Sequence, residues 1–407
     1  MARRIVMKNS TPPLAEMQGL YGPFTLTERV VQKIWLRGDF DRRQLRLVDG
    51  RRVEVRSVGV WNLLGGPDFR AARLVIDGVA ITGDIEVHFH VADWRAHKHE
   101  SDSAYDHVVL HVVLFPPAPG EAPARRGDGA DIPTLVLLPH LHRDLEEYAS
   151  DDALEVITAR DAWEKFAALA ATPPAELPGL LRQKARERWQ QKVRFARLRI
   201  ERVGWAAAAH CTALEILGYR LNRAAMLTVA SRFPIEDWPA VDLARIYADS
   251  GADWQTHGVR PANHPRARLR QYHAWLTRTP AWPDALLRLA KALPEGGWEA
   301  VPVKTARQGL ALADWRERFA TDLTGGAVGG SRLDTLVCDG LLPLVAAQTG
   351  RDAGAVWFSW YLGDVPDQVR AALPKLGVAG RGTEPLCHGW GQGLLGWVLE
   401  AEARATR

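Results

Sequence analysis

The sequence predicts an α+β protein. A small mixed sheet with flanking helices is expected over residues 20–142, followed by an all-helical domain over residues 150–407. Two patterns favour this fold, because strand-like alternation is confined to the N-terminal part and helical periodicity takes over beyond about residue 150. The length of 407 residues is a third indication, since one simple core rarely extends that far and two domains are the default expectation.

In the N-terminal part, a helix is expected over Thr25–Leu36, where Thr25 and Glu28 have the spacing of a capping box. Strands are expected in RRVEVRSVGV, ARLVIDG and VAITGDIEVHFHV, and Asp77-Gly78 between the last two is a typical hairpin turn. A short helical or looped piece over Asp93–Tyr105 leads to the buried strand VVLHVVLF. A Pro- and Gly-rich loop and a last strand, TLVLLP, complete the sheet.

The C-terminal part lacks strand signals. An apolar stripe from Leu181 to Val203 predicts one long helix. Further helices are expected over Trp205–Leu217, Arg223–Arg232, Pro239–Asp249, Pro265–Thr277, Asp284–Leu293, Leu333–Gln348 and Gly391–Ala403.

Composition limits the compartment and the partners. The three cysteines, Cys211, Cys338 and Cys387, are far apart, so neither a disulfide framework nor a paired-cysteine zinc motif is expected. The basic start MARRIVMKNS has no apolar run behind it, which argues against a signal peptide, and no apolar stretch is long enough to span a bilayer. We therefore expect a cytoplasmic protein without a membrane partner.

The chemistry is concentrated between residues 65 and 113, where five of the thirteen histidines fall between His88 and His107. Asp68 precedes one expected strand, and Glu86 and His88 in the next strand point the same way because they are two residues apart. His90 is expected to continue that face. Two carboxylates and a backbone carbonyl can hold Mg²⁺ or Mn²⁺, and a neutral imidazole can accept a proton from water.

The order of helix, three strands, helical piece and strand, with Pro67-Asp68 and Glu86-x-His88, resembles the core of the PD-(D/E)XK nuclease superfamily. The resemblance implies that Asp68 and Glu86 bind a divalent cation. It also implies that His88 occupies the position of the lysine that positions or activates water, and that Glu28 lies where some members carry an extra carboxylate. Histidine lacks the fixed charge and the reach of lysine, which implies an altered catalyst, a preference for Mn²⁺, or lost catalysis.

A purely structural interpretation stays open for the same residues. Asp68 can belong to an ordinary turn after two glycines, Glu86, His88 and His90 to a solvated strand face, and Glu28 to a helix cap.

The histidine-rich segment allows two further interpretations. His88, His90, His97 and His99 can bind zinc, although no cysteine is near and their spacing matches no standard zinc module. Alternatively, Asp93, His97 and Asp106 support the site or fix the loop after the third strand, and His111 is a hydrogen-bonded core residue.

A basic helix is the second candidate surface. Nine lysines and arginines between Arg182 and Arg202 are opposed only by Glu187 and Glu201. Such a face suits a phosphate backbone, and the residues expected to contact nucleic acid are Arg186, Lys192, Arg194 and Arg197. The alternative is a solvated helix whose acidic partners lie elsewhere in the fold.

Several stretches resemble a bacterial family known as domain of unknown function 2851. They are LTERVVQKIW, GGPDF, GDIEVHFHVADWRAHKHESDSAYDHVVLHVV, LGYRLNR, GVRPANHPRARLRQ and CHGWGQGLLGW. The resemblance implies a match over most of the chain, but it does not indicate an activity. From the residues we expect a metal-dependent nuclease or a catalytically altered descendant; the alternatives are a non-catalytic nucleic-acid-binding or scaffold protein and a zinc-dependent hydrolase.

Overall fold

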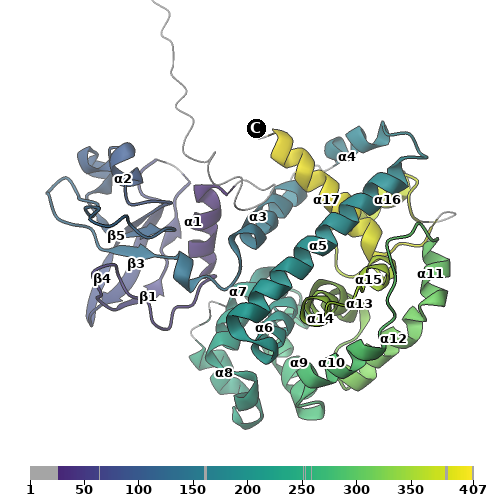
Figure 1. The fold of residues 1–407 in the computed structure, drawn as a ribbon. Helices are drawn as coiled ribbons and strands as arrows, with labels where there is room; N and C mark the ends of the chain where they lie inside the picture. Colours follow the sequence, from purple (N-terminus) through teal and green to yellow (C-terminus); the bar gives the residue numbers. More distant parts are fainter. Residues whose placement is uncertain are drawn as a thin grey trace, which may run out of the picture.

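The computed structural model describes residues 26–63, 65–159, 163–250, 252, 254–257, 259–380 and 384–405. Thr25, the basic start of the sequence and residues 20–25 of the first expected domain lie outside the described residues. Figure 1 shows a mixed sheet formed by the N-terminal part beside a larger group of helices formed by the rest of the chain. The expected α+β architecture is confirmed at this level.

Within the described residues the sheet has six strands: β1 (Val53–Ser57), β2 (Val60–Trp61), β3 (Phe69–Ile76), β4 (Val79–His88), β5 (Val108–Val113) and β6 (Thr134–Val136). Their order is β1-β3-β4-β5-β6, and the short β2 pairs with the start of β3. The β1–β3 and β3–β4 pairs are antiparallel, whereas β4–β5 and β5–β6 are parallel. The crossover from β4 to β5 therefore begins at the end of β4 that carries Glu86 and His88.

The turn between β3 and β4 is the expected two-residue hairpin. Asp77 has a φ of 46° and Gly78 a φ of 85°, the left-handed values that a type I′ turn needs at both central positions. The turn sets a register in which Ile76 faces Val79, and a one-residue shift between Ala72 and Phe69 then places Phe69 opposite Ile85. This register decides which residues meet across the pair.

Helix α1 (Glu28–Arg37) packs against β4 through its apolar face. The expected capping box is wrong, because the residue at the N-cap is Thr27, without a side-chain cap, and Glu28 is the first helical residue. The side chain of Glu28 is thereby free to face the sheet. Gly38 ends the helix in the left-handed conformation, with a φ of 59°.

The crossover between β4 and β5 contains α2 (Asp93–Ala96) and the 3₁₀ turns η2 (His99–Ser101) and η3 (Ser103–Tyr105), so the expected helical or looped piece is confirmed. It has a small core of its own, formed by Trp94, Tyr105, Val108, Ala124 and Ile132. The indole Nε1 of Trp94 donates to the carbonyl of Arg125 at 2.8 Å, which ties the loop before β6 to the crossover.

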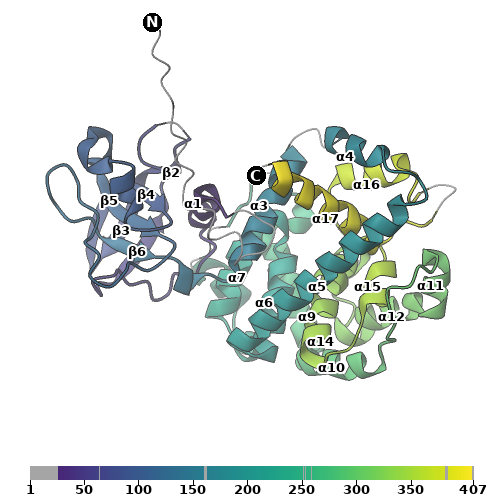
Figure 2. The same cartoon turned by 45° about the horizontal axis from the view of Figure 1, so that its top comes forward.

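The rest of the chain is helical (Figure 2). Its α-helices are α3 (Leu145–Ala159), α4 (Trp163–Ala170), α5 (Leu177–Val203), α6 (Trp205–Leu217), α7 (Tyr219–Arg232), α8 (Leu243–Asp249), α9 (Pro265–Arg278), α10 (Trp282–Ala292), α11 (Val303–Gly309), α12 (Leu312–Arg318), α13 (Gly330–Thr335), α14 (Leu342–Thr349), α15 (Gly354–Ser359), α16 (Asp367–Lys375) and α17 (His388–Ala405). Shorter 3₁₀ segments are η4 (Leu138–His140), η5 (Ile235–Ala240) and η6 (Pro261–Asn263), and π-helical segments are η7 (Phe319–Leu323) and η8 (Leu336–Leu341).

Most expected helices occur close to their expected positions. The helix over Trp205–Leu217 has the expected bounds, and the long helix α5 packs against α14 and α17. The helix expected to begin at Pro239 begins at Leu243, because Pro239 belongs to η5 and the Asp242 side chain caps the Ala244 N–H. The helix expected over Leu333–Gln348 is interrupted by the π-helical turn η8.

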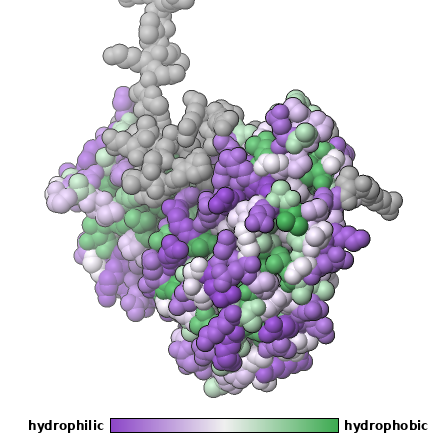
Figure 3. All heavy atoms as spheres, turned by 45° about the vertical axis from the view of Figure 1, so that its right-hand side comes forward, coloured by the Kyte–Doolittle hydropathy of each residue, from purple (hydrophilic) through white to green (hydrophobic). Residues whose placement is uncertain are grey.

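The main hydrophobic core runs without interruption from the sheet into the helices. A buried ionic network joins the two parts: Arg143 pairs with Asp39, beside α1, and with Asp151 in α3. On the face shown in Figure 3, hydrophilic residues predominate, with smaller hydrophobic areas between them. None of the helices among the described residues has both the length and the apolar character needed to cross a bilayer.

Candidate functional site

The carboxylates of Asp68 and Glu86 meet at one end of the β3–β4 pair. Because Phe69 faces Ile85 across the pair, Asp68 lies beside Glu86. The backbone N–H of Asp68 donates to Glu86 Oε2 at 2.9 Å, and the N–H of Val87 donates to Asp68 Oδ2 at 3.1 Å. The fold thus brings together the two acidic side chains that the sequence singled out.

Helix α1 adds two side chains to this end of the sheet. Gln32 donates from Nε2 to Asp68 Oδ1 at 2.7 Å, which orients the carboxylate. Glu28 lies one turn earlier on the same helix face, accepts the backbone N–H of Phe89, and is close enough to Asp68 and Glu86 to be repelled by both. The predicted supporting role of Glu28 therefore has a geometric basis.

The three carboxyl groups hold their protons more tightly than free carboxyl groups do. Burial raises the pKa of Asp68 to about 7, and the charge of Glu86 adds to that effect. Burial also raises the pKa of Glu86 to about 8. The pKa of Glu28 rises to about 7 through burial and through repulsion by Asp93, Asp68 and Glu86. A divalent cation among these oxygens would offset the repulsion and favour the ionised forms.

A cluster of imidazoles lies directly beside Glu86. The ring nitrogens of His88, His97 and His99 can all lie within 4.8 Å of one another. His88 Nε2 is 3.1 Å from His97 Nδ1, and Glu86 Oε1 is 3.4 Å from Nε2 of both His88 and His99. Glu86 thus directs one oxygen toward the histidines and the other toward Asp68.

His88 follows Glu86 by two residues and is the last residue of β4. It is 1 % exposed, and its Nδ1 lies 2.9 Å from Nε2 of the equally buried His111. Burial and the neighbouring imidazoles hold its pKa well below the ordinary value. His88 is therefore a neutral ring suited to orienting a partner or ligating a cation, and poorly suited to storing a proton. The expected core role of His111 is confirmed by its burial and this hydrogen bond.

Three other predicted side chains have different surroundings. β4 ends at His88, so the alternation does not reach His90, whose ring stacks on Phe115 with 5.2 Å between centroids. Asp93 accepts the backbone N–H of His90 at 2.8 Å and thereby fixes the start of the crossover. Asp106 is exposed and borders Gly127 in the loop between β5 and β6, so its role in the loop after the third strand stays a prediction.

The structure adds residues to the candidate site beyond those that the sequence predicts. Gln32 follows Glu28 by four residues, a spacing that places both on one helix face and could have indicated the contact. His99 was considered only for zinc, yet it contacts Glu86 and stacks on Tyr105 with 3.8 Å between centroids. Lys98 between the two histidines has a φ of 61°, a left-handed kink that no local pattern predicts.

The basic helix α5 is largely engaged within the protein. Lys192 pairs with Asp339 at 2.8 Å, and Arg194 pairs with Glu146. Arg186 and Arg197 are exposed. The acidic partners that the sequence placed elsewhere in the fold are thus present for two of the four residues, and nucleic-acid binding by this helix stays a prediction.

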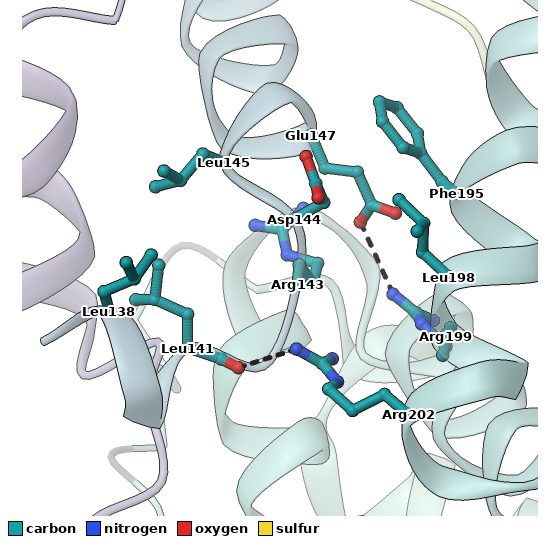
Figure 4. Close-up of a pocket in the computed structure, with 10 residues that line it drawn as sticks. All are labelled: Leu138, Leu141, Arg143, Asp144, Leu145, Glu147, Phe195, Leu198, Arg199 and Arg202. Atoms are coloured by element: carbon teal, nitrogen blue, oxygen red, sulfur yellow. Dashed lines mark hydrogen bonds and ion pairs between the residues drawn. The ribbon is translucent and has the colours of Figure 1, made fainter. Parts of the chain in front are cut away.

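A hollow of about 310 Å³ lies between α3, α5 and the segment before α3 (Figure 4). Its arginines are used internally: Arg199 contacts Glu147 at 3.4 Å, and Arg202 donates to the carbonyl of Leu141 at 3.0 Å. Arg143, the third, holds the buried ionic network described above. The arginines that line the hollow therefore already have partners within the protein.

The fold and the site define a mixed α+β protein whose sheet carries a buried carboxylate cluster beside a histidine cluster. The family model described as protein of unknown function (DUF2851) matches residues 28–242, more than half of the chain. The chain belongs to this family, as the sequence resemblance predicts. The stretches GVRPANHPRARLRQ and CHGWGQGLLGW lie beyond the matched residues. No curated protein and no solved structure matches the chain.

Proposed function

We propose that this protein is a divalent-metal-dependent nuclease that hydrolyses phosphodiester bonds in DNA or RNA. The observation that carries the proposal is the convergence of Asp68, directly before β3, and Glu86, in β4, with the Asp68 N–H donating to Glu86 Oε2 at 2.9 Å. The order of α1, the antiparallel strands, α2 and the parallel strand β5 supports the likeness to the PD-(D/E)XK core.

The donor set suits a hard cation. Asp68 and Glu86 offer carboxylate oxygens, the ligands that Mg²⁺ and Mn²⁺ prefer, and both groups retain protons near neutral pH when no cation is present. When bound, such an ion supplies positive charge for the phosphoryl oxygens and acidifies a water molecule. The residues that would hold it are Asp68 and Glu86.

The remaining side chains have separable tasks. Gln32 fixes the orientation of Asp68 through its 2.7 Å hydrogen bond. Glu28 is half-buried and has a pKa of about 7, so it can take up or release a proton near neutrality. His88, neutral and held by His97 and His111, orients its surroundings. Glu28 is therefore better suited than His88 to transfer a proton to or from the attacking water.

The test is a cleavage assay on purified protein. End-labelled single- and double-stranded DNA and RNA are incubated with Mg²⁺ or Mn²⁺, and Glu86→Ala is compared with Glu54→Ala, an exposed glutamate of β1. We expect cutting by the wild type and by Glu54→Ala, and no cutting by Glu86→Ala. Equal cutting by all three proteins would identify a contaminating nuclease and would refute the assignment.

The non-catalytic alternative predicts a different pattern in the same samples. A nucleic-acid-binding scaffold would cut none of the substrates, would bind them with an affinity that falls steeply with salt, and would bind equally well after Glu86→Ala. That result would replace the nuclease proposal.

A further inference from the structure

The histidine cluster beside Glu86 has the dimensions of a transition-metal site. A tetrahedral zinc ion with bonds of about 2.0–2.1 Å to nitrogen separates its ligand atoms by about 3.3 Å. The contact from His88 Nε2 to His97 Nδ1 is 3.1 Å, and those from Glu86 Oε1 to Nε2 of His88 and of His99 are each 3.4 Å. These three separations are close to the spacing of zinc ligands, and the three imidazole nitrogens all lie within 4.8 Å of one another.

One of these nitrogens lacks the partner that a buried polar atom normally has. His99 is 8 % exposed, and its Nε2 is fully buried without a hydrogen-bond partner among the described residues. Its neighbour is Glu86 Oε1 at 3.4 Å, beyond good hydrogen-bonding geometry. A cation between the two would satisfy both atoms at once.

The rings are also held in place from behind. His99 stacks on Tyr105 at 3.8 Å and lies edge-on to Trp94 at 5.2 Å. His88 Nδ1 lies 2.9 Å from His111 Nε2, so a proton on Nδ1 can be donated there while Nε2 remains available for a metal. His97 is the exposed member of the cluster.

We infer that His88, His97 and His99, with Glu86, form a binding site for a borderline transition-metal ion, of which Zn²⁺ is the expected occupant. Imidazole nitrogen favours zinc over Mg²⁺, whereas the oxygens around Asp68 favour the harder ions. Glu86 lies between the two donor sets, with Oε1 toward the histidines and Oε2 toward Asp68. The ion would hold the kinked segment around Lys98 against the end of β4, whether or not the carboxylates catalyse a reaction.

The test uses full-length, untagged protein dialysed against a chelator and titrated with Co²⁺, whose visible absorption reports tetrahedral nitrogen and oxygen ligands. Zinc content after Zn²⁺ loading and desalting is measured in parallel. His97→Ala is the main variant, because an exposed side chain can be removed without disturbing the core. His99→Ala is the second variant, and His90→Ala is the matched control, because its ring lies on Phe115 outside the cluster.

We expect one equivalent of tightly bound metal in the wild type and in His90→Ala. Binding should weaken by roughly 100-fold or more in His97→Ala and His99→Ala, at least the loss seen when partners of metal ligands are removed. The inference is overturned if the wild type binds no stoichiometric metal, or if His97→Ala binds as the wild type does. Asp68→Asn separates the two proposals, because it should abolish cleavage and leave Co²⁺ binding intact.

Discussion

Glu86→Gln should make the metal-free protein more stable at alkaline pH, although it removes a buried charged group. In the folded protein, burial raises the pKa of Glu86 from 4.5 to about 8. Between these values the folded state binds more protons than the unfolded state, so stability falls as pH rises through this window. Glutamine cannot ionise, and its amide oxygen can still accept the Asp68 N–H that Glu86 accepts at 2.9 Å.

The size of the effect follows from the same pKa. Each tenfold change in the protonation equilibrium corresponds to about 1.4 kcal/mol. A rise from 4.5 to about 8 therefore means that ionised Glu86 costs the folded state on the order of 5 kcal/mol above pH 8. Since domains are commonly stable by only about 5–15 kcal/mol, such a difference is readily measured.

The assay is urea unfolding in a chelating buffer between about pH 5 and pH 9. The lowered pKa values of His88, His99 and His111 act in the opposite direction, because their contribution to stability is lost as pH falls below 6.5. That effect acts below pH 6.5 and is present in both proteins, so it does not decide their difference near pH 9. We expect Glu86→Gln and wild type to agree near pH 5 and to diverge by several kcal/mol near pH 9.

Glu54→Gln is the control, because it makes the same chemical change on the exposed face of β1. Its unfolding curve should follow the wild type at every pH. Parallel curves for wild type and Glu86→Gln across the whole range would show that Glu86 ionises normally in the fold, and the electrostatic reasoning about the site would fail.

Two further predictions concern neighbouring contacts. Gln32→Ala removes the 2.7 Å hydrogen bond to Asp68, so the pKa of Asp68 should rise further. The Mn²⁺ affinity, measured by calorimetry, should therefore fall roughly tenfold at neutral pH and by less at alkaline pH. Gln44→Ala, at an exposed glutamine, should change neither the pKa of Asp68 nor the Mn²⁺ affinity. An equal loss of Mn²⁺ affinity in Gln32→Ala at neutral and alkaline pH would contradict this explanation. Arg143→Met leaves the buried Asp39 without its cation, while Asp151 keeps Arg223, and should destabilise the protein by about 3–5 kcal/mol in urea unfolding. A change below about 1 kcal/mol would show that water replaces the arginine.

Local patterns sufficed for the strands and for part of the site. The left-handed preference of Asp77-Gly78 fixes a two-residue turn and the register from Ile76 to Ala72. A one-residue shift between Ala72 and Phe69, which the sequence does not indicate, then places Asp68 beside Glu86. The two-residue period of a strand then puts His88 on the same side as Glu86. The turn and the shared side of Glu86 and His88 follow from short-range geometry, which a sequence expresses directly.

The remaining site depends on where elements end and on distant partners. The strand period fails at His90 because β4 stops at His88 and the Asp93 side chain takes the His90 N–H. Lys192 and Arg194 are predicted to bind phosphate because the sequence does not indicate their acidic partners. In the fold these partners are Asp339 and Glu146. Such pairings join residues far apart in the sequence, so helical periodicity cannot reveal them.

The shared position of Glu86 constrains how the two proposed ions can coexist. Oε2 already accepts the Asp68 N–H and Oε1 faces two imidazoles, so each oxygen has one direction left for a cation. A zinc ion at the histidines would withdraw charge from Glu86 and lower the pKa of its carboxyl, which favours its ionised form at neutral pH. Zinc loading should therefore keep the carboxylates ionised and able to bind a hard cation at neutral pH. After zinc removal, any Mn²⁺-dependent cleavage should require a higher pH.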